Sequence, residues 1–569
     1  MNSKREALKP IMGKLAKLLP LLASDKSGEV TNAADRIVRL LATVKLDWHD
    51  LVALLDQEAE PLQMRNSFPF ETDPEALMRL ASSASYFLDA EREVFADISM
   101  NGCRQTWPLA SPQYSEWLMR SFWLEKARLA ADGHMKNVLR LLRAQTRFSD
   151  AVQHNVHLRV AEADEKIYLD LADDTWRAVE ISAAGWRIVD APPVRFRRPA
   201  GMQALPLPVC GGNINELRPF INLGDADFLL VVAFLLDTLR VGRPHPVLYL
   251  AGGEGTAKST LTQLLAGLVD PGQLKLRGLP RLRDLFVAAH NQTILCFDNV
   301  SKIPPEVSDG ICQLASGAGY AKRKNYTDSD ELYIRGSHPV ILNGIENCID
   351  RPDLADRAVI ITLPRVDAKR RRSDVEFWTA FNSARPRILG ALLDIAVRGL
   401  GRQHEIRMAE LVRVADFQRW AIACEPAFAQ AGDFERAFKS NVSNTVENLL
   451  DVDPVAKAIA AFMLGRTAWK GTAAQLLAKL VRSDPTEARV TRLPAWPRDP
   501  ARLSKALRSM QATLAKAGIM VNFGKAVDRR RTRIIELSTM TSEYDSRGEM
   551  PSVRNEIGDE GQRNHEFGR

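Results

Sequence analysis

The residues best suited to chemistry lie together between Gly252 and Thr260, where glycines precede a lysine and a hydroxyl side chain. Their spacing is the GxxxxGK[ST] pattern of a phosphate-binding loop, with Ala257 where the last glycine usually stands. Glycines allow such a loop to turn its backbone N–H groups toward a β-phosphate. Lys258 would then reach the β- and γ-phosphates, and the Ser259 hydroxyl would hold Mg²⁺. The sequence therefore predicts a site for ATP and Mg²⁺ made by Gly252, Gly253, Glu254, Gly255, Thr256, Ala257, Lys258, Ser259 and Thr260.

A second candidate for this site is Asp298, which follows the apolar run 293–297. An acid that a buried strand delivers beside a phosphate-binding loop is expected to hold the Mg²⁺, through water. The next residue is Asn299, where a glutamate that polarises the attacking water is usual. An amide cannot accept a proton as a carboxylate does. Two alternatives stay open: the base is Glu306 or Asp309, or hydrolysis is slow.

The elements around these residues predict how they are positioned. A buried strand at 246–250 precedes the loop, and an amphipathic helix with Leu261, Leu264, Leu265 and Leu268 on one face follows it. Strands and helices alternate over 245–365, which predicts an α/β domain with a mostly parallel sheet. An apolar helix is expected over 226–240. We therefore place the ATPase core at 226–365.

The rest of the chain divides by its hydrophobic period. Helical spacing predicts helices over 1–62, and more helices, broken near 101–112, are expected over 74–153. Short alternating runs predict a small antiparallel β domain at 157–200. The remaining boundaries are a helical lid or linker at 366–450, a small domain at 452–538 and a polar, disordered tail at 542–569.

Composition limits the class of protein. The 569 residues include 77 Lys and Arg against 70 Asp and Glu, a net charge of +7, which suits a protein that meets a polyanion over part of its surface. The six cysteines are scattered without a CxxC pair, which argues against a disulfide framework or a structural zinc site. No apolar run reaches the length of a membrane span. We expect a soluble, cytoplasmic protein.

Three runs carry a family resemblance: GGEGTAKST at 252–260, CFDNVS at 296–301, and the stretch 326–358 that contains HPVILNG and DRPDLADRA. Together they resemble a family of phage and mobile-element ATPases that are similar to the helicase half of primase–helicases, in the superfamily 3 and AAA+ group. The resemblance spans 150–538 and is specific in 246–365. It implies ATP-driven assembly of a ring, expected to be a hexamer, and movement on DNA. It also implies that the pair Asp298-Asn299 is a family trait.

The resemblance assigns two more site residues. Asn343, at the end of the apolar run 339–342, matches the polar residue of a strand that lies between the loop strand and the Asp298 strand, where it orients water near the γ-phosphate. Arg357 matches an arginine finger that enters the neighbouring subunit's site, with Arg351 as the second choice. The alternative for Arg357 is a salt bridge within its Asp-rich segment.

The sequence offers two contacts for DNA. The first is Lys322, Arg323 and Lys324, flanked by Tyr320 and Tyr326, where rings of this group place a pore hairpin that would grip a single strand. The second is a winged helix at 452–538, whose wing carries Arg529, Arg530 and Arg531 and would dock on duplex DNA. The alternatives are a solvated basic turn for the first and a protein-binding winged helix for the second.

These observations lead to a fold and a function. The fold class is multidomain α/β: a P-loop AAA+-like ATPase core with a helical N-terminal region, a small β domain and a C-terminal winged helix. The favoured function is an ATP-dependent DNA helicase or translocase of a mobile element, acting in replication as a homo-oligomeric ring. The first alternative is a DNA-bound loader or regulatory ATPase without unwinding activity. The second is an ATP-binding scaffold that does not hydrolyse.

Overall fold

The structure is a computed structural model that describes most of the chain in two compact units, Met1–Ala76 and Leu77–Arg569. The described residues are 9–23, 27–51, 71–273, 276–317, 320–323, 331–334, 336–345, 348–408, 413–483, 496–525 and 533–539. The expected tail at 542–569 lies outside them. Each unit is described by itself.

The N-terminal unit is helical, as the spacing of its leucines and isoleucines predicts. Its elements are η1 (Lys9–Ile11), α2 (Met12–Leu18), η2 (Leu19–Ala23) and α3 (Ser27–Thr43). Apolar side chains from these elements and from the turn after α3 form its core: Ile11, Leu15, Ile37, Leu41, Leu46 and Leu51.

The segment after it is mixed, so the expectation of a helical domain at 74–153 is wrong for its middle part. Helices α5 (Asp73–Ala81), α6 (Pro112–Lys126) and α7 (Asp132–Phe148) accompany an antiparallel sheet, β1 (Ser85–Leu88), β2 (Val94–Met100) and β3 (Cys103–Pro108). The physical reason is the turn Asn101-Gly102, whose φ angles of 53° and 80° are those of a tight hairpin. This turn pairs Met100 with Cys103.

The expected strands at 157–200 are present. Strands β5 (Val160–Ala163), β6 (Lys166–Asp170), β7 (Ala178–Ser182) and β8 (Gly185–Val189) form an antiparallel meander, beside the short parallel pair β4 (Val156–His157) and β9 (Arg195–Phe196). One face of the meander, with Val160, Ile167 and Leu169, belongs to the same hydrophobic core as the helices of the central region. The meander therefore packs on the central region instead of standing alone.

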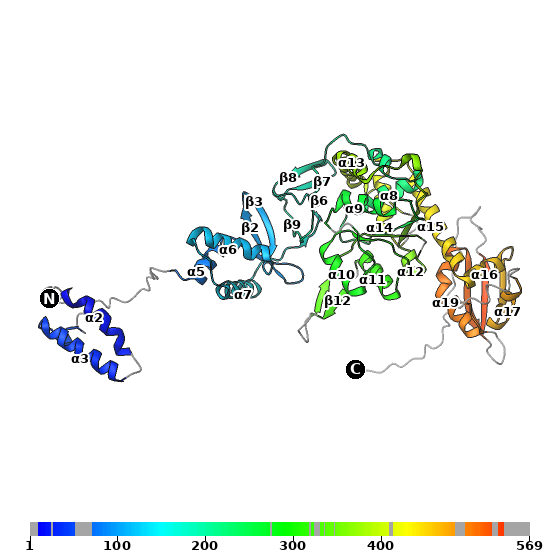
Figure 1. Ribbon diagram of the computed structural model, residues 1–569. Helices are drawn as coiled ribbons and strands as arrows, with labels where there is room; N and C mark the ends of the chain where they lie inside the picture. Colours follow the sequence, from blue (N-terminus) through cyan, green and yellow to red (C-terminus); the bar gives the residue numbers. More distant parts are fainter. Residues whose placement is uncertain are drawn as a thin grey trace, which may run out of the picture. The chain divides into compact units, whose positions relative to one another are not determined.

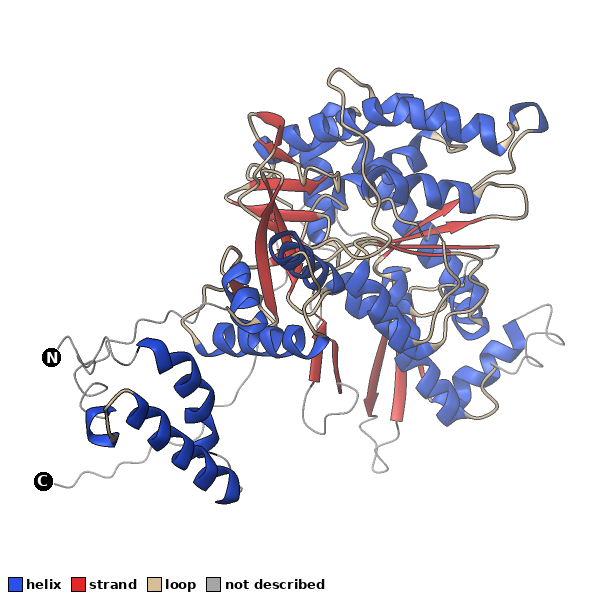
Figure 2. Cartoon of the chain, turned by 60° about the vertical axis from the view of Figure 1, so that its left-hand side comes forward, coloured by secondary structure: helices blue, strands red, loops and turns tan. Residues whose placement is uncertain are grey.

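The centre is a parallel sheet with the strand order β11-β14-β10-β15. Its strands are β10 (Val247–Ala251), β11 (Leu295–Phe297), β14 (Val340–Gly344) and β15 (Ala358–Thr362). Successive side chains of β10 belong to different cores: Leu248 and Leu250 to one, Val247 and Tyr249 to the other. Helices α8 and α9 cover the first face, and α10 and α11 cover the second (Figure 1). Figure 2 shows strands, in red, with helices, in blue, on both sides. The sheet is thus buried on both sides, as a parallel sheet requires.

Helices alternate with the strands over 245–365, as the sequence predicts, and helices follow over 366–450. The helices of this region are η3 (Ile214–Phe220), α8 (Asp225–Asp237), α9 (Lys258–Val269), α10 (Leu282–Asn291), α11 (Pro305–Ser316), α12 (Pro352–Ala355), η4 (Ala368–Arg370), α13 (Asp374–Arg402), α14 (Ala415–Cys424), η5 (Glu425–Ala427) and α15 (Asp433–Val452). An antiparallel pair, β12 (Tyr320–Arg323) and β13 (Glu331–Ile334), leaves the sheet after α11. It extends away from the sheet, past α10 and α11, in Figure 1.

The C-terminal part has the helices that were expected and one strand more. Helices α16 (Pro454–Met463), α17 (Ala473–Ser483) and α19 (Pro500–Lys516) pack on a sheet of order β16-β18-β17, made by β16 (Ala468–Gly471), β17 (Ile519–Lys525) and β18 (Arg533–Thr539). Asp453 and Asp499 cap α16 and α19 through backbone N–H groups. Gly518, with φ of 78°, ends α19.

No single helix among the described residues is both long and apolar enough to cross a membrane, and only the bent pair of η3 and α8 reaches that length and hydropathy jointly.

Candidate nucleotide site

The predicted phosphate loop leaves the carboxyl end of β10 and enters α9 at Lys258. Gly252 and Gly255 have φ angles of 156° and 74°, so the loop uses backbone that favours glycine. Ala257 also has a left-handed conformation, with φ of 62° and ψ of 31°. An L-residue with a Cβ occupies this region at a cost of about 1–2 kcal/mol. The alanine keeps the backbone conformation that the pattern requires and stores strain in it.

Lys258 lies across the loop in this structure. Its Nζ donates to the carbonyl oxygens of Gly252, at 2.6 Å, and of Gly253, at 2.8 Å. Thr256 is buried, and its hydroxyl also donates to the Gly253 carbonyl, at 2.9 Å. These contacts hold the ammonium group over the turn where a phosphate would lie, so a phosphate would exchange them for its own oxygens.

Ser259 and Asp298 meet although 39 residues separate them. The Ser259 hydroxyl donates to Oδ1 of Asp298 at 2.7 Å. The pair forms because α9 starts at the end of β10 and Asp298 follows the end of β11, on the same edge of the sheet. Both side chains are partly exposed, and both present hard oxygen atoms. Such oxygens are the ligands that Mg²⁺ prefers.

Asn343 lies on the strand that the resemblance implies, because β14 pairs with β10 on one side and with β11 on the other. Its side chain is 1% exposed. The amide Nδ2 donates to Thr262 on α9 at 2.9 Å, and Oδ1 accepts the backbone N–H of Asn299 at 3.1 Å. Asn343 therefore joins the loop helix to the turn after Asp298 and uses its polar atoms there. Asn299 itself is exposed, with φ of 55°.

Arg357 lies at the amino ends of the parallel strands, whereas the predicted phosphate loop lies at their carboxyl ends. It precedes β15, and its carbonyl accepts the N–H of Val247 at the start of β10. The five residues of β10 separate this amino end from the loop by about 16 Å. The Arg357 guanidinium donates to Ser316 at 3.0 Å and to the carbonyl and carboxylate of Asp353 at 2.8 Å. Arg357 is thus too far from its own subunit's loop to contact a phosphate there.

Other charged side chains near Arg357 form ion pairs and hydrogen bonds of their own. Arg351 donates to the Pro305 carbonyl and pairs with Asp309 at 2.8 Å. Burial raises the pKa of Asp353, but the hydrogen bonds from Arg357 and Cys312 and the charges of Arg357 and Arg413 outweigh it, so the pKa is lowered. The ion pair with Arg351 means that Asp309, one of the two candidate bases, already has a cationic partner.

A cavity of about 310 Å³, which the sequence did not predict, opens beside the second half of the loop. Gly255, Thr256 and Ala257 line one side, and aromatic rings of η3 and α13, Phe220 and Phe377, line another. The segment after β15 runs along the loop, since Val366 donates its N–H to the Gly255 carbonyl at 3.1 Å. Polar side chains, Asn222 and Asp374 among them, line it as well, and a pocket of this size with an aromatic wall can hold a flat ring.

Two arginines near the loop were also missed. A methyl group built on Gly255 would lie 3.5 Å from Nη2 of Arg371 and 3.9 Å from Nε of Arg365. Both residues are exposed. The signal in the sequence was the run 365–372, in which five of eight residues are cations. The sequence alone reads such a run as a solvated surface, because it does not tell which loop lies next to it.

The predicted DNA contacts are described only in part. Lys322 and Arg323 lie on β12, paired with Leu332 and Glu331 of β13, so the expected hairpin is present in the backbone. Lys324 and the residues Arg529, Arg530 and Arg531 lie outside the described residues.

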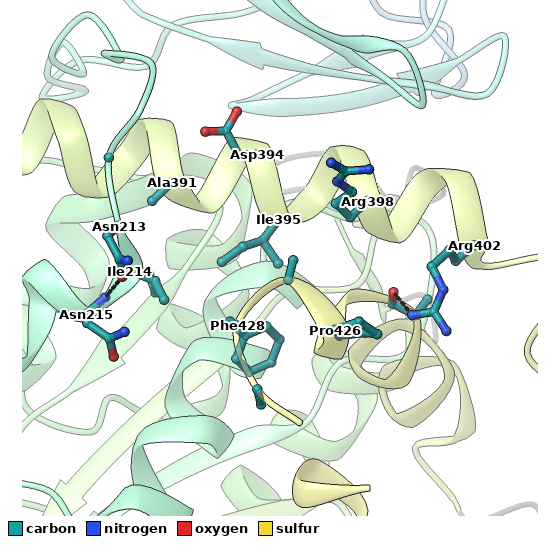
Figure 3. Close-up of a pocket in the computed structure, with 14 residues that line it drawn as sticks. Asn213, Ile214, Asn215, Ala391, Asp394, Ile395, Arg398, Arg402, Pro426 and Phe428 are labelled. Carbon is teal, nitrogen blue, oxygen red and sulfur yellow. Dashed lines mark hydrogen bonds between the residues drawn. The ribbon is translucent and has the colours of Figure 1, made fainter. Parts of the chain in front are cut away.

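A larger cavity, of about 700 Å³, lies elsewhere on the central region, between α13 and η5 (Figure 3). Ile395 and Phe428 form an apolar floor, and Arg398 and Arg402 lie one turn apart on α13. Arg402 donates to the Ala423 carbonyl at 3.1 Å. None of the predicted site residues lines this cavity, which sets it apart from the nucleotide site.

Two family models match this chain. Residues 214–440 match the family described as "Actinomycete integrative conjugative element replication protein", and residues 455–552 match its C-terminal domain. No curated protein matches the chain. Among solved structures, one titled "SCCmec type IV Cch - active helicase" is similar at 12% identity and a TM-score of 0.44, over 80% of this chain and 92% of that one. The apo A form of the NrS-1 C-terminal region is similar at 13% identity and a TM-score of 0.34, over 83% of this chain and all of that one. Residues 214–440 and 455–552 of this chain therefore match the models of a replication protein family of integrative conjugative elements and of its C-terminal domain.

Proposed function

We propose that this replication protein is an ATP-dependent DNA helicase or translocase with an AAA+-like core. The single observation that carries the proposal is the contact of Ser259 with Asp298, next to a loop crossed by Lys258. Two segments that are distant in sequence supply a hydroxyl and a carboxylate at one edge of a parallel sheet, which is the arrangement that binds a nucleotide with its metal.

The residues fit Mg²⁺ and ATP. Ser259 and Asp298 would hold Mg²⁺, which when bound neutralises charge that develops on the phosphates. The backbone of Gly253 to Thr260 would bind the phosphates at the start of α9. Lys258 would leave the Gly252 and Gly253 carbonyls to do so. Arg365 and Arg371, the cations nearest Gly255, would bind from the other side.

The base for hydrolysis is Glu306 in this proposal. Asp309 is paired with Arg351, whereas Glu306 is exposed in the first turn of α11, which follows Asp298 in the chain. Asn299 would orient water and not accept a proton. Asn343 would act by fixing the turn of Asn299 against α9, and its contact with water would require that its present hydrogen bonds open.

DNA would lie against the hairpin of β12 and β13 in a hexameric ring, and duplex DNA would meet a winged helix at 452–538. The order helix, strand, helix, helix, strand, strand of this part supports a winged helix. Arg357 would act on the neighbouring subunit, since about 16 Å of strand separates it from its own loop. A regulatory ATPase that does not unwind is the second candidate, favoured by the engaged state of Arg357.

The test is ATP hydrolysis with and without single-stranded DNA, together with strand separation. We expect Lys258→Ala to abolish hydrolysis, because the described part of the loop offers the phosphates no other cation from its own residues. Lys302→Ala is the matched control, since Lys302 is an exposed lysine four residues after Asp298. Wild-type turnover in Lys258→Ala would disprove the site. Turnover without strand separation would favour the regulatory ATPase.

A further inference from the structure

Asn222 is a polar side chain of the cavity beside the predicted phosphate loop, and its own hydrogen bond fixes its orientation. Asn222, which follows η3, lines this cavity together with Phe220 and Phe377. Its Nδ2 donates to the carbonyl oxygen of Pro364 at 3.0 Å. Pro364 lies in the segment that follows β15 and runs along the loop. Asn222 thus joins both walls of the cavity.

The chemistry of this hydrogen bond determines which way the amide faces. A carbonyl oxygen only accepts, so the NH₂ group of Asn222 must face Pro364. Its Oδ1 then faces away from Pro364, and no donor among the described residues is recorded for that oxygen. The cavity therefore contains a fixed hydrogen-bond acceptor beside its apolar side chains. Its other polar lining consists of two threonines and the exposed charged residues Arg370, Arg371, Arg372 and Asp374.

The walls fit a flat ring. The rings of Phe220 and Phe377 meet edge to face, with centroids 5.8 Å apart. Both side chains are partly exposed, and Ile221, Leu363 and Val366 add apolar surface. Aromatic and aliphatic walls bind every purine equally well, because they offer no hydrogen bonds to the ring edge. Discrimination between bases must come from the polar groups.

We infer that Asn222 selects adenine nucleotides over 6-oxopurine nucleotides at this site, an inference that rests on the proposed function. An acceptor can bind the exocyclic amine at position 6 of adenine. Guanine and hypoxanthine have an oxygen at that position, which would face Oδ1 with no hydrogen between them. A fixed acceptor therefore favours one base and rejects the other.

The experiment measures the affinity of the full chain for four diphosphates by calorimetry: ADP, IDP, GDP and purine riboside diphosphate, which has hydrogen at position 6. We expect wild-type protein to bind ADP about tenfold tighter than purine riboside diphosphate, the usual value of one hydrogen bond, and IDP and GDP more weakly still. Equal affinity for ADP and IDP would overturn the inference.

Asn222→Leu keeps the shape of the side chain and removes the acceptor. We expect the four affinities to converge to within about threefold, because the fixed acceptor is lost and the charged residues that still line the cavity, Arg370 to Arg372 and Asp374, are exposed to solvent. Water can replace the amide at the exposed Pro364 carbonyl. The matched control is Asn215→Leu, an exposed amide of η3 that lines a different cavity, which should keep the wild-type order. If Asn222→Leu does not fold, Asn222→Ala gives the same comparison, because alanine also lacks an acceptor.

The outcomes separate this inference from the proposed function. If the wild-type protein binds and hydrolyses ATP but Asn222→Leu keeps the wild-type preference, the inference fails and the proposed function stands. If the wild-type protein binds none of the four diphosphates, the nucleotide site itself is wrong and both fail.

Discussion

Replacing Arg357 by alanine separates a structural role from a catalytic one. The change removes hydrogen bonds to Ser316 and to the carbonyl and carboxylate of Asp353. Each such bond contributes about 1 kcal/mol, and the pair with Asp353 less, because that carboxylate is 42% exposed. We therefore expect a loss of about 2 kcal/mol in the free energy of unfolding, which leaves the protein folded.

A finger that acts across subunits would add a much larger effect on turnover. Where such fingers act, they are worth about 10³–10⁵ in rate. A loss of about 2 kcal/mol in stability cannot produce this change while the protein stays folded. The expected result is near-normal ATP binding, a melting temperature lowered by a few degrees and turnover lowered at least about a thousandfold. Arg413→Ala is the control, because Arg413 contacts the same carboxylate at 2.9 Å.

Mixing subunits tests the direction of the contact. Lys258→Ala subunits keep Arg357, and Arg357→Ala subunits keep their own phosphate loop. At equal amounts about one quarter of the interfaces combine an intact loop with an intact arginine, so ATPase activity should recover to about that fraction. Turnover of Arg357→Ala within threefold of wild type would refute the finger. A large loss without recovery at any mixing ratio would refute the action across subunits.

Three further changes have defined outcomes. Arg159→Met should lower the free energy of unfolding by about 3–5 kcal/mol in guanidinium titrations, because it removes the cation that lies 3.0 Å from the buried carboxylate of Asp270. Adding Asp270→Asn should recover part of the loss, and an Arg159→Met variant as stable as wild type would contradict the expectation. Ala257→Gly should bind ADP as well as wild type, whereas Ala257→Val should bind at least about tenfold more weakly, since a β-branched residue resists φ of 62°; equal affinities would show that the strain is absent. Neutralising Lys322, Arg323 and Lys324 should lower the salt dependence of single-strand binding by about 0.7 per lost phosphate contact, and it should abolish the stimulation of ATP turnover by DNA. Neutralising Arg529, Arg530 and Arg531 should leave the maximal DNA-stimulated turnover unchanged. The reverse pattern would place the DNA contact that drives turnover in the C-terminal part.

Some features followed from the sequence because they depend on neighbours along the chain. The phosphate loop could be predicted since strand, glycines, lysine and helix are consecutive. The strands at 157–200 were predictable for the same reason. The hairpin of β2 and β3 is also local: Asn101-Gly102 is a strong turn signal, and the prediction placed a break in the helices there but not a hairpin.

Other features depend on contacts between distant segments, which only the tertiary structure decides. Asn343 lies one residue before the end of β14, close to the strand end that was expected. Its buried amide bonds to Thr262, 81 residues away, which determines what its polar atoms can contact. Arg357 lies in a charged segment of the sequence, whereas in the structure its guanidinium donates three hydrogen bonds, to Ser316 and to the carbonyl and carboxylate of Asp353. The cavity of about 310 Å³ joins η3, the predicted phosphate loop and the start of α13, which are distant in sequence and brought together by packing. Periodicity records which face of an element is buried, and it does not record which other element covers that face.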